Sequence, residues 1–471
     1  MAKQKQKAKT PEEALREALV PSKTVPYEIP ANWCWVKVNC VCEFERGITF
    51  PASAKEIEFS ATNIPCLRTA NVQDELALND LIYVDKKYMK NNSAKLVRMN
   101  DIIMSSANSR ELVGKVSYVH HLEFPMTFGG FVMAIRAKSI SSQYLFYFLR
   151  LEFLLGHFIG ESAQTTNIAN INASKLGGYN FPLPPLAEQQ RIVDRIESLF
   201  AKLDEAREKA EAALASFELR RAAILHKAFT GALTVKWREE HGAGMESWRT
   251  VTIKEICHSL KYGTAKKSEI SGKVVVIRMG NLQNGEIIWD NLAYSNDSED
   301  IEKYLLKPGD VLFNRTNSAA LVGKTSIYRG EYPAIYAGYI IKLDYDRNRI
   351  IGDFLNYALN TVEAKAYCDS VKTDGVNQSN INAQKIGAYQ FSLPSLPEQK
   401  EIIRLLDDFF AKEQKAKALA ESVLKTVDTM KQSILARAFR GKLGTGDSGD
   451  ESARDMLLRM YGENEELGMR N

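Results

Sequence analysis

The sequence predicts a mixed α/β (α+β) protein, in which two α/β domains are separated by two long antiparallel coiled-coil helices within an internal two-fold repeat. The first observation is a duplication. Residues 167–186 read NIANINASKLGGYNFPLPPL and residues 377–396 read NQSNINAQKIGAYQFSLPSL, which is an ungapped offset of 210 residues (377 − 167). A repeat of this kind decides the architecture before any single element is considered.

The duplication also extends upstream into the rest of each copy. DIIMSSANSRELVGK at 101–115 matches DVLFNRTNSAALVGK at 310–324, and FGGFVMAI at 128–135 matches YAGYIIKL at 336–343. Each copy therefore holds a variable part, in which short β-rich runs alternate with turn residues, followed by a helical part. One helix is expected after the core strands of each variable part, over 142–155 and 352–366.

The helical parts are the second observation, because their apolar residues keep a 4-3 alternation over more than three heptads. The seam consists of Ile192, Ile196, Leu199, Leu203, Ala206, Ala210, Ala213 and Phe217 in the first copy, and of Ile402, Leu406, Phe409, Ala416, Ala420, Val423, Val427, Met430 and Ile434 in the second, where Glu413 interrupts it. About 44 residues would reach roughly 65 Å. The most economical partner of each helix is its duplicate, in an antiparallel pair. The alternative is that each helix packs separately on its own domain.

Prolines before each helix and the glycines Gly231 and Gly441 after them give the boundaries, which are the third observation. The predicted division is 1–26 (an N-terminal helical segment), 27–181 (first globular domain), 182–231 (central long helix), 232–247 (linker), 248–391 (second globular domain), 392–443 (distal long helix) and 444–471 (C-terminal tail helix). Packing of the N-terminal helix (11–19) against the tail helix (451–460) would close the repeat.

Composition limits the function without naming it. The chain has 471 residues, 45% hydrophobic and 25% charged, with a formal net charge of +4, so any phosphate-binding surface must be local. There is no apolar run of the ~20 residues that a membrane helix needs, nor the apolar stretch of a signal peptide, and we expect a cytoplasmic protein. The six cysteines form no C-x-x-C pair and the six histidines no metal spacing, so no metal site is expected.

Catalytic motifs are not found in the sequence. Gly323-Lys324-Thr325 resembles the end of a phosphate loop, but Ser318 stands where that loop needs its first glycine. No N-P-P-[YF] or D-P-P-[YF] tetrad of an amino-methyltransferase occurs. We therefore expect no catalytic residues and no cofactor in this chain.

The two copies share polar, donor-rich loops, which are candidates for contact with DNA. Arginine and lysine can pair with guanine, asparagine and glutamine with adenine, and serine and threonine with phosphate or either base. The candidates are Arg68, Asn71, Ser105, Ser106, Asn108, Lys115, Gln164, Thr165, Thr166, Arg278, Asn281, Asn314, Arg315, Asn317, Lys324, Asn377 and Gln378. The alternative is that the asparagines form turns, and for Asn170 and Asn380 this structural role is the favoured interpretation.

Two variable domains, each followed by a helix with the same start and end, resemble the specificity subunits of type I restriction–modification systems. The starts are PLPPLAEQ at 182–189 and LPSLPEQ at 393–399, and the ends are AFTGAL at 228–233 and AFRGKL at 438–443. Leu19-Val20-Pro21 and the later Trp33 also fit this family. The match covers nearly the whole chain, and Ser395 in place of the second proline is the one departure.

The resemblance implies that each globular domain is a target recognition domain reading one half of a bipartite, asymmetric double-stranded DNA target. It implies that the paired helices fix the spacer and dock two modification subunits, which bind S-adenosylmethionine and methylate adenine. A separate restriction/translocase subunit would use ATP and Mg. The chain itself would then be a non-catalytic recognition subunit that holds no cofactor and touches no membrane.

Two rival functions stay open at this point. The first is a recognition subunit of a related system, whose partner fuses nuclease and methyltransferase in one chain. The second is a coiled-coil scaffold whose duplicated domains bind protein or peptide, which would show no salt-sensitive binding to duplex DNA. A stand-alone methyltransferase would need the S-adenosylmethionine motifs that are missing.

Overall fold

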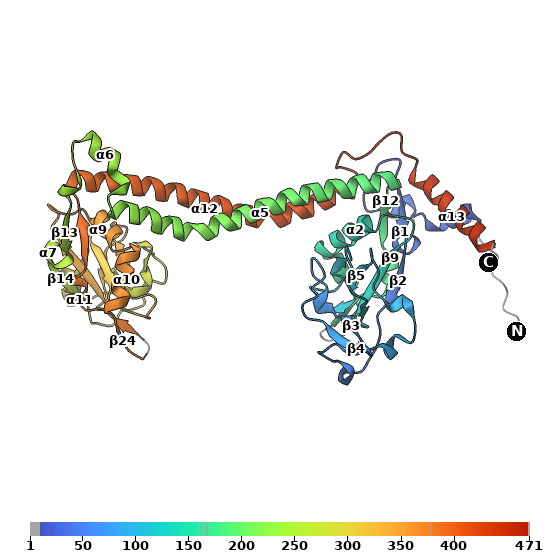
Figure 1. Ribbon diagram of the computed structural model, residues 1–471, viewed down its shortest axis with the longest axis horizontal. Coiled ribbons are helices and arrows are strands. Elements are labelled where there is room, and N and C mark those ends of the chain that lie inside the picture. The colour runs from blue at the N-terminus through green and yellow to red at the C-terminus, as the bar shows by residue number, and fades with distance from the viewer. Residues whose placement is uncertain (1–9, 162, 166–167, 377, 470–471) are drawn as a thin grey trace. The chain divides into compact units, whose positions relative to one another are not determined.

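A computed structural model describes residues 10–161, 163–165, 168–376 and 378–469 (Figure 1). The chain forms two compact units. Unit 1 consists of residues 1–209 and 423–471, and unit 2 of residues 210–422. Each unit holds one globular domain together with the adjoining parts of both long helices, α5 (Leu186–Phe229) and α12 (Leu396–Ala438).

Unit 1 is built around a four-stranded antiparallel sheet in the order β2-β9-β5-β7, with a three-stranded sheet in the order β4-β3-β8 beside it. The strands are β1 (Cys34–Lys37), β2 (Cys42–Arg46), β3 (Asn63–Leu67), β4 (Ile82–Asp85), β5 (Ile102–Ser105), β6 (Ala107–Asn108), β7 (Val116–Tyr118), β8 (Thr127–Phe128), β9 (Val132–Ala137), β10 (Ala163–Thr165), β11 (Ile168–Asn170) and β12 (Asn180–Leu183). The shorter helices are α1 (Pro11–Ala18), α2 (Ser142–Leu154), α3 (His157–Glu161), α4 (Ala173–Gly177) and α13 (Ala453–Met469).

Unit 2 repeats this plan with a six-stranded sheet in the order β14-β23-β19-β21-β17-β16 and a three-stranded sheet in the order β18-β15-β22. The strands are β13 (Arg249–Thr252), β14 (Cys257–Tyr262), β15 (Val274–Ile277), β16 (Leu282–Gln283), β17 (Gly285–Ile287), β18 (Tyr294–Ser295), β19 (Val311–Asn314), β20 (Thr316–Asn317), β21 (Thr325–Ile327), β22 (Ala334–Tyr336), β23 (Ile340–Tyr345), β24 (Thr373–Asp374), β25 (Ser379–Asn380) and β26 (Gln390–Leu393). The shorter helices are α6 (Val235–Glu240), α7 (Ile253–Ile256), α8 (Ser298–Tyr304), α9 (Gly352–Ala358), α10 (Val362–Val371) and α11 (Ala383–Gly387).

The central strand of each domain is apolar on both faces because it separates two cores. In β5, Ile102 and Met104 belong to the core under α2, while Ile103 faces the second core of the same domain. In β19, Phe313 belongs to the core that includes residues of α9, while Leu312 faces the second core of the second domain. Successive strand residues point to opposite faces, so a continuous apolar run is what a strand buried on both sides requires.

Each domain core is completed by the beginning of one long helix and the end of the other. In unit 1 the residues Ile192 and Ile196 of α5 share a core with Leu435 and Ala438 of α12. In unit 2 the core takes Ile402 and Leu406 of α12 together with Leu225 and Ala228 of α5. The A-F-x-G motifs at the helix ends are therefore core positions: Ala228 and Ala438 are both fully buried.

The two predicted long helices are confirmed, and within each unit they run antiparallel. In unit 1, Asp204 pairs with Lys431 and Arg207 with Asp428, so the partner's number falls as α5 advances. In unit 2, Arg220 of α5 pairs with Glu413 of α12, with its Nε 3.1 Å from Oε2. Glu413 is the residue that interrupts the heptad seam, and this ion pair fills the place of the missing apolar contact.

The Glu–Gln pair at the start of each long helix is buried and ties the helix to its domain. Gln189 Oε1 accepts a hydrogen bond from the backbone N–H of Ser141, the N-cap of α2, at 2.8 Å. Gln399 Oε1 accepts one from Ile351, the N-cap residue of α9, at 2.9 Å. These glutamines satisfy backbone donors that a helix N-terminus leaves unpaired, which explains why the duplicated motif keeps them.

The glutamates of the same motif bind a tryptophan indole in each unit. Trp33 Nε1 donates to Glu188 Oε2 at 2.8 Å, and Trp248 Nε1 donates to Glu398 Oε2 at 2.9 Å. In unit 2 the predicted linker 232–247 folds over this site as α6, whose Arg238 forms a salt bridge of 2.7 Å with Glu398. The linker is thus an ordered part of unit 2.

The helices after the core strands differ in part from the prediction. The first, α2, ends at Leu154, close to the expected end, but the expected helix over 352–366 is divided into α9 and α10. The break falls where the hydroxyl of Thr361 caps α10 by accepting from the N–H of Ala364 at 3.1 Å. Threonine competes with the helix for backbone hydrogen bonds, and this local capping ends one helix and starts the next.

The terminal helices α1 and α13 pack together in unit 1, as the sequence suggested. The core of unit 1 takes Ala453, Met456 and Leu457 from α13, and Leu15 of α1 packs against the same cluster. The C-terminal segment thus supplies part of the first domain's core.

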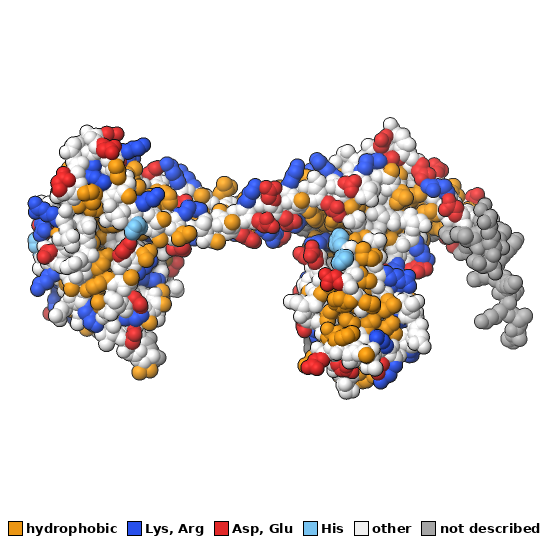
Figure 2. Space-filling view, in the orientation of Figure 1, with side chains coloured by type: hydrophobic (Ala, Val, Ile, Leu, Met, Phe, Trp, Pro, Cys, Tyr) orange, Lys and Arg blue, Asp and Glu red, His pale blue; other side chains and the backbone are white. Residues whose placement is uncertain are grey.

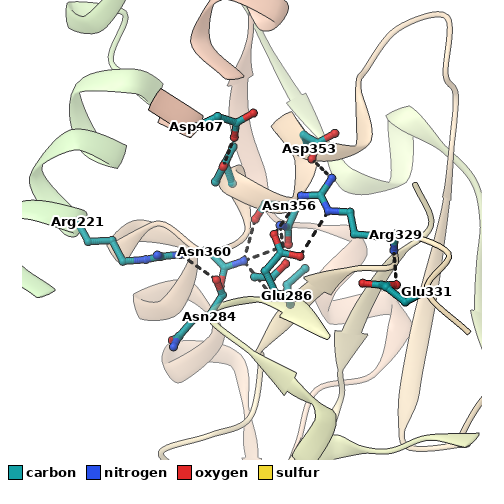
Figure 3. A network of polar contacts seen from close by, with 12 residues as sticks. Arg221, Asn284, Glu286, Arg329, Glu331, Asp353, Asn356, Asn360 and Asp407 are labelled. Atoms are coloured by element: carbon teal, nitrogen blue, oxygen red, sulfur yellow. Dashed lines mark hydrogen bonds and ion pairs between the residues drawn. The ribbon is translucent and has the colours of Figure 1, made fainter. Parts of the chain in front are cut away.

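A polar network joins the second domain to both long helices in unit 2 (Figure 3). Arg221 of α5 donates to the carbonyl of Asn284 at 3.0 Å, and Tyr357 of α9 donates to the carboxylate of Asp407 on α12. On the far side of Asn360 and Asn356 from Arg221, Arg329 forms salt bridges with Glu286 and Asp353. The bonds of Arg221 and Tyr357 thus tie the second domain to both helices within its unit, while those of Arg329 lie inside the domain.

Candidate nucleic-acid interface

The polar loops that the two copies share are held by the same backbone hydrogen bonds in each domain. The N–H of Ser105 donates to the carbonyl of Lys115 at 2.9 Å, and the N–H of Asn314 donates to that of Lys324 at 2.8 Å. The residue after each of them is joined to an aromatic residue: Ser106 N–H donates to the Phe131 carbonyl, and Arg315 N–H to that of Tyr339. The two surfaces can therefore be compared position by position.

Arg68 and Arg278 occupy equivalent places and both fold back onto their own domains. Arg68 forms a salt bridge of 2.7 Å with Asp80 and also donates to the Asp80 carbonyl. Arg278 donates to the carbonyl of Asn291. These contacts brace the loop that follows each arginine, and they use part of the hydrogen-bonding capacity that base recognition would need.

Asn71 and Asn281 are buried and close the same two loops. The amide of Asn71 donates to the carbonyls of Ala77 at 2.8 Å and Asp80 at 3.1 Å, and its oxygen accepts from the N–H of Arg68. Asn281 makes the equivalent three bonds. Both amide hydrogens are thus used inside the protein, so this geometry favours the turn-forming role, and their contact with DNA stays a prediction.

Several other candidates also shape the loops from within. Ser105, Ser106 and Asn314 are buried. Asn108 donates to Ser105 Oγ at 3.0 Å, and its oxygen accepts from the N–H of Ser109; Asn317 accepts from Ser318 in the same way. DNA contact by these residues is untested. Their burial and bonding point to positioning of the surface residues around them.

The two shared lysines form equivalent pairs with glutamines that the sequence analysis did not select. Lys115 Nζ donates to Gln73 Oε1, and Lys324 Nζ donates to Gln283 Oε1 at 2.6 Å. Partial burial, together with the charge of nearby Lys365, lowers the pKa of Lys324 below its ordinary value. Gln73 and Gln283 follow the duplicated Arg-x-x-Asn motif by two residues, and this shared spacing is the signal that could have identified them.

Like Arg278, Arg315 pairs with no carboxylate among the described residues, but it is held by side chains from other parts of the domain. Its guanidinium lies 4.8 Å above the ring of Tyr262, and it donates to Asn380 Oδ1 at 3.1 Å. The Tyr262 hydroxyl accepts from the N–H of Ala383, and Asn380 donates to Thr316 Oγ1. Tyr262 and Asn380 are thus fixed, and they hold the cation in one place. This agrees with the structural role that the sequence favoured for Asn380.

The remaining candidates are Gln164, Thr165, Thr166, Asn377 and Gln378. Gln164 and Thr165 belong to β10, but their side chains are outside the described set. Thr166 and Asn377 lie outside the described residues altogether, and Gln378 is exposed. These positions stay predictions from the sequence.

The first domain carries a cavity of about 460 Å³ beside these loops, lined by Arg46, Lys55, Arg68 and Phe131 among others. Its charged lining residues are all basic, and Phe131 is 61% exposed. Figure 2 shows apolar side chains gathered on this domain, with acidic and basic side chains interspersed along the helices. Arg46 and Phe131 lie outside the polar loops that the sequence analysis compared.

Metal-ligating side chains do not cluster among the described residues, and several of the thiols are buried. The described residues contain no group of three or more His, Cys, Asp or Glu side chains placed to hold a metal ion. Burial raises the pKa of the thiols of Cys34, Cys42 and Cys66 to about 12, which disfavours the reactive thiolate. None of the described helices is both long and apolar enough to cross a membrane.

Duplicated α/β domains joined to paired helices are shared with a known protein family. The family model described as the type I restriction modification DNA specificity domain matches residues 30–214 and again residues 245–422. The chain belongs to this family of type I specificity subunits. The two matches correspond to the two copies of the internal repeat, each reaching from a globular domain into a long helix.

Individual relatives agree over nearly the full length of this specificity subunit. The StySPI specificity subunit of Salmonella potsdam is 30% identical over 88% of this chain and 90% of its own. The EcoKI specificity subunit of Escherichia coli is 27% identical over 93% and 96%. The relatives are named as specificity subunits, and the chain is accordingly a recognition subunit rather than a catalytic one.

Solved structures show the same fold. The HsdS subunit from Thermoanaerobacter tengcongensis superimposes with a TM-score of 0.63 and 19% identity, over 88% of this chain and 99% of that one. A chain from a structure describing assembly and conformational transition of the type I system superimposes with a TM-score of 0.62 and 19% identity. The match covers 88% of this chain and 100% of that one. The prediction of two α/β domains with two long helices is confirmed.

Proposed function

We propose that this specificity subunit reads a bipartite, asymmetric sequence in double-stranded DNA, one half with each globular domain. The observation that carries the proposal is that two domains of one fold present equivalent loops, held by matching backbone hydrogen bonds, with different side chains at Ser106 and Arg315. Two domains that recognise different base sequences can share one backbone structure, but they need different side chains at the positions that contact the bases.

The paired helices are proposed to set the number of unspecified base pairs between the two halves and to dock two modification subunits and the restriction/translocase subunit. Their exposed surface mixes acidic and basic side chains, which suits specific protein contacts more than a continuous DNA track (Figure 2). S-adenosylmethionine, ATP and Mg are assigned to those partners, and this chain is proposed to bind no cofactor and to act in the cytoplasm.

Division of labour follows from the chemistry of base methylation. A methyltransferase must extrude its target adenine from the duplex before it can react. A separate subunit that binds the flanking sequence supplies the energy and the position for that step. Recognition is therefore proposed to reside in this chain, and bond formation in the modification subunits.

The function is tested by mapping methylated bases in a host genome that expresses this chain with its modification subunits. The expected result is methylation of one split motif, lost when the gene for this chain is deleted while the partners stay. Unchanged methylation without this chain would contradict the proposal. A continuous motif, without a spacer, would contradict the assignment of one half to each domain.

A further inference from the structure

The two recognition surfaces can be divided into residues that are the same in both domains and residues that differ at equivalent positions. The shared set is the Lys115–Gln73 pair and its counterpart, Lys324–Gln283. Each lysine follows a glycine whose N–H bonds to the central strand: Gly114 to Ser105, and Gly323 to Asn314, both at 2.8 Å. The backbone thus places these two amines equivalently.

The differing set lies next to the shared pairs. Gly47 and Gly263 are equivalent, because their N–H groups donate to Val132 and Ile340 at the start of the matching strands β9 and β23. The residue before each glycine is Arg46 in the first domain and Tyr262 in the second.

At the next pair of equivalent positions, the arginine is in the second domain instead of the first. The first domain has buried Ser106 there, and the second has Arg315. Each domain thus carries an arginine at one of these two positions: Arg46 ends β2 and donates to the Gly130 carbonyl at 3.3 Å, and Arg315 directly follows β19. In both domains the site borders an aromatic residue, Phe131 or Tyr339, whose carbonyl accepts from Ser106 or Arg315.

We propose that the shared Lys–Gln pairs contact the phosphate backbone, and that Arg46 and Arg315 read bases in the two different half-sites. The proposal rests on the proposed function, because it assumes that both domains bind duplex DNA. A side chain that is identical in two readers of different sequences can recognise only what the two half-sites have in common. The sugar–phosphate backbone is common to every sequence, and a lysine amine binds phosphate as a point charge.

The geometry of Arg315 is that of a prepared base-reading group. Tyr262 supports one face of the guanidinium, and Asn380 holds one of its nitrogens, so little side-chain entropy is left to lose on binding. Among the contacts of the described residues, Nη1 has no acceptor. A fixed, uncompensated guanidinium of this kind favours guanine, whose O6 and N7 accept two hydrogen bonds.

Arg68 and Arg278 are assigned a different role by the same comparison. They are identical in the two domains, and each is bonded to its own loop, through Asp80 or Asn291. They are loop braces, and neither is expected to determine the sequence that its domain reads.

The test uses the complete complex with its modification subunits, on a duplex that carries the methylated motif and on a scrambled duplex, between about 50 and 200 mM salt. Lys115→Gln and Lys324→Gln are each expected to weaken binding to both duplexes by the same factor. Each should also reduce the slope of log affinity against log salt by about 1. Lys254→Gln, which removes an exposed lysine from α7 of the second domain, is the matched control and should change neither quantity.

Arg315→Gln is expected to weaken binding to the motif about 5- to 150-fold while leaving the scrambled duplex within twofold. Methylation in the host should then relax at one base pair in the half read by the second domain. Arg46→Gln should do the same in the other half. Arg315→Lys keeps the charge but not the planar fork, so a loss of specificity in this variant too identifies base reading rather than charge.

Three results separate failure of this inference from failure of the proposed function. If Lys324→Gln changes the ratio of motif to scrambled binding, the phosphate assignment is overturned. If Arg315→Gln weakens both duplexes equally in a complex that assembles and melts as the wild type does, the base-reading assignment is overturned. If the wild-type complex itself shows no salt-dependent binding and no preference for the motif, the proposed function is wrong.

Discussion

Arg238 and Glu398 form a salt bridge of 2.7 Å between the linker helix α6 and the start of α12, with side chains only 8% and 0% exposed. Glu398 also accepts hydrogen bonds from Thr234 and Trp248, so the carboxylate is shared by three donors from residues 234–248. The ion pair joins the segment after one long helix to the beginning of the other, within unit 2.

Removing one partner of this buried pair should destabilise unit 2 strongly. Arg238→Ala leaves the Glu398 carboxylate without its cation in a site closed to water, and a loss of about 3–5 kcal/mol is expected. Differential scanning calorimetry should show a lower melting temperature for one transition. Glu188→Ala is the comparison in unit 1, where no salt bridge reaches the glutamate among the described residues, and a smaller loss of about 1–3 kcal/mol is expected. If the two variants lost equal unfolding free energy, the salt bridge would not be the source of the added stability in unit 2.

Arg220 and Glu413 should behave as a partly exposed pair on the helix seam. Their side chains are 40% and 21% exposed, so Arg220→Ala should cost only about 0.5–1 kcal/mol. Replacing both residues by leucine restores the heptad pattern that Glu413 interrupts, and this double variant should be at least as stable as the wild type. Thermal melts of Arg220→Leu, Glu413→Leu and the double variant measure the interaction energy between the two positions. A double variant that melts well below both singles would show that the ion pair specifies the helix register.

The cysteines should be unreactive in the folded protein. The pKa of the Cys257 thiol is raised by burial to about 12 and that of Cys368 to about 11, as for the buried thiols of unit 1. Since the thiolate is the reacting form and a raised pKa depletes it, only about one thiol in ten thousand with a pKa of 12 is ionised at pH 8. A thiol-specific chromophore should therefore react slowly with native protein and faster as the pH rises, with half-buried Cys40 first.

In denaturant all six cysteines should react at once, because unfolding returns their pKa values to the ordinary range. Rapid, complete reaction of the native protein at pH 8 would show that these side chains are not packed as described.

Lengthening both helices should change the spacer and leave the half-sites as they are. Inserting one heptad into α5 near Ala206–Ala213 and one at the facing turns of α12 preserves the apolar seam. The added length should increase the unspecified spacer by about one to three base pairs. Sequencing of methylated DNA measures both features together. A changed half-site with an unchanged spacer would remove the helices from the role proposed for them.

The domain order and the two long helices were predictable because the sequence patterns that indicate them do not depend on knowing which residues are in contact. The repeat at an offset of 210 residues, the heptads and the proline and glycine boundaries gave both long helices within a few residues of their observed ends. A heptad seam indicates directly which helix face is buried. For two helices of 44 and 43 residues, an antiparallel partner was the economical choice.

The division of α9 from α10 was not predictable in the same way. Between Gly352 and Ala366 the two helices are separated at Asn360 and Thr361, residue types of low helix propensity, and Thr361 caps the second helix. Weak helix formers also occur inside helices, so these two residues alone do not decide between one helix and two.

The candidate site was predictable as a set of loops, but the role of each side chain was not. Asn71 and Arg68 carry the residue types that bind DNA, yet their hydrogen bonds lie within their own loop. Backbone hydrogen bonds, which the sequence does not display, make Arg46 equivalent to Tyr262 and Arg315 equivalent to Ser106. An ungapped alignment cannot reveal that the arginine is at a different one of these two positions in each domain.

The central claim is that each globular domain reads its own half of a split target, and exchange of one domain tests it most directly. Residues 27–181 are replaced by the corresponding domain of a relative with a different target, and the methylated motif is mapped in a host that also expresses the modification subunits. The account predicts that one half of the motif changes to that of the donor, while the other half stays. A motif altered in both halves, or in neither, would contradict it.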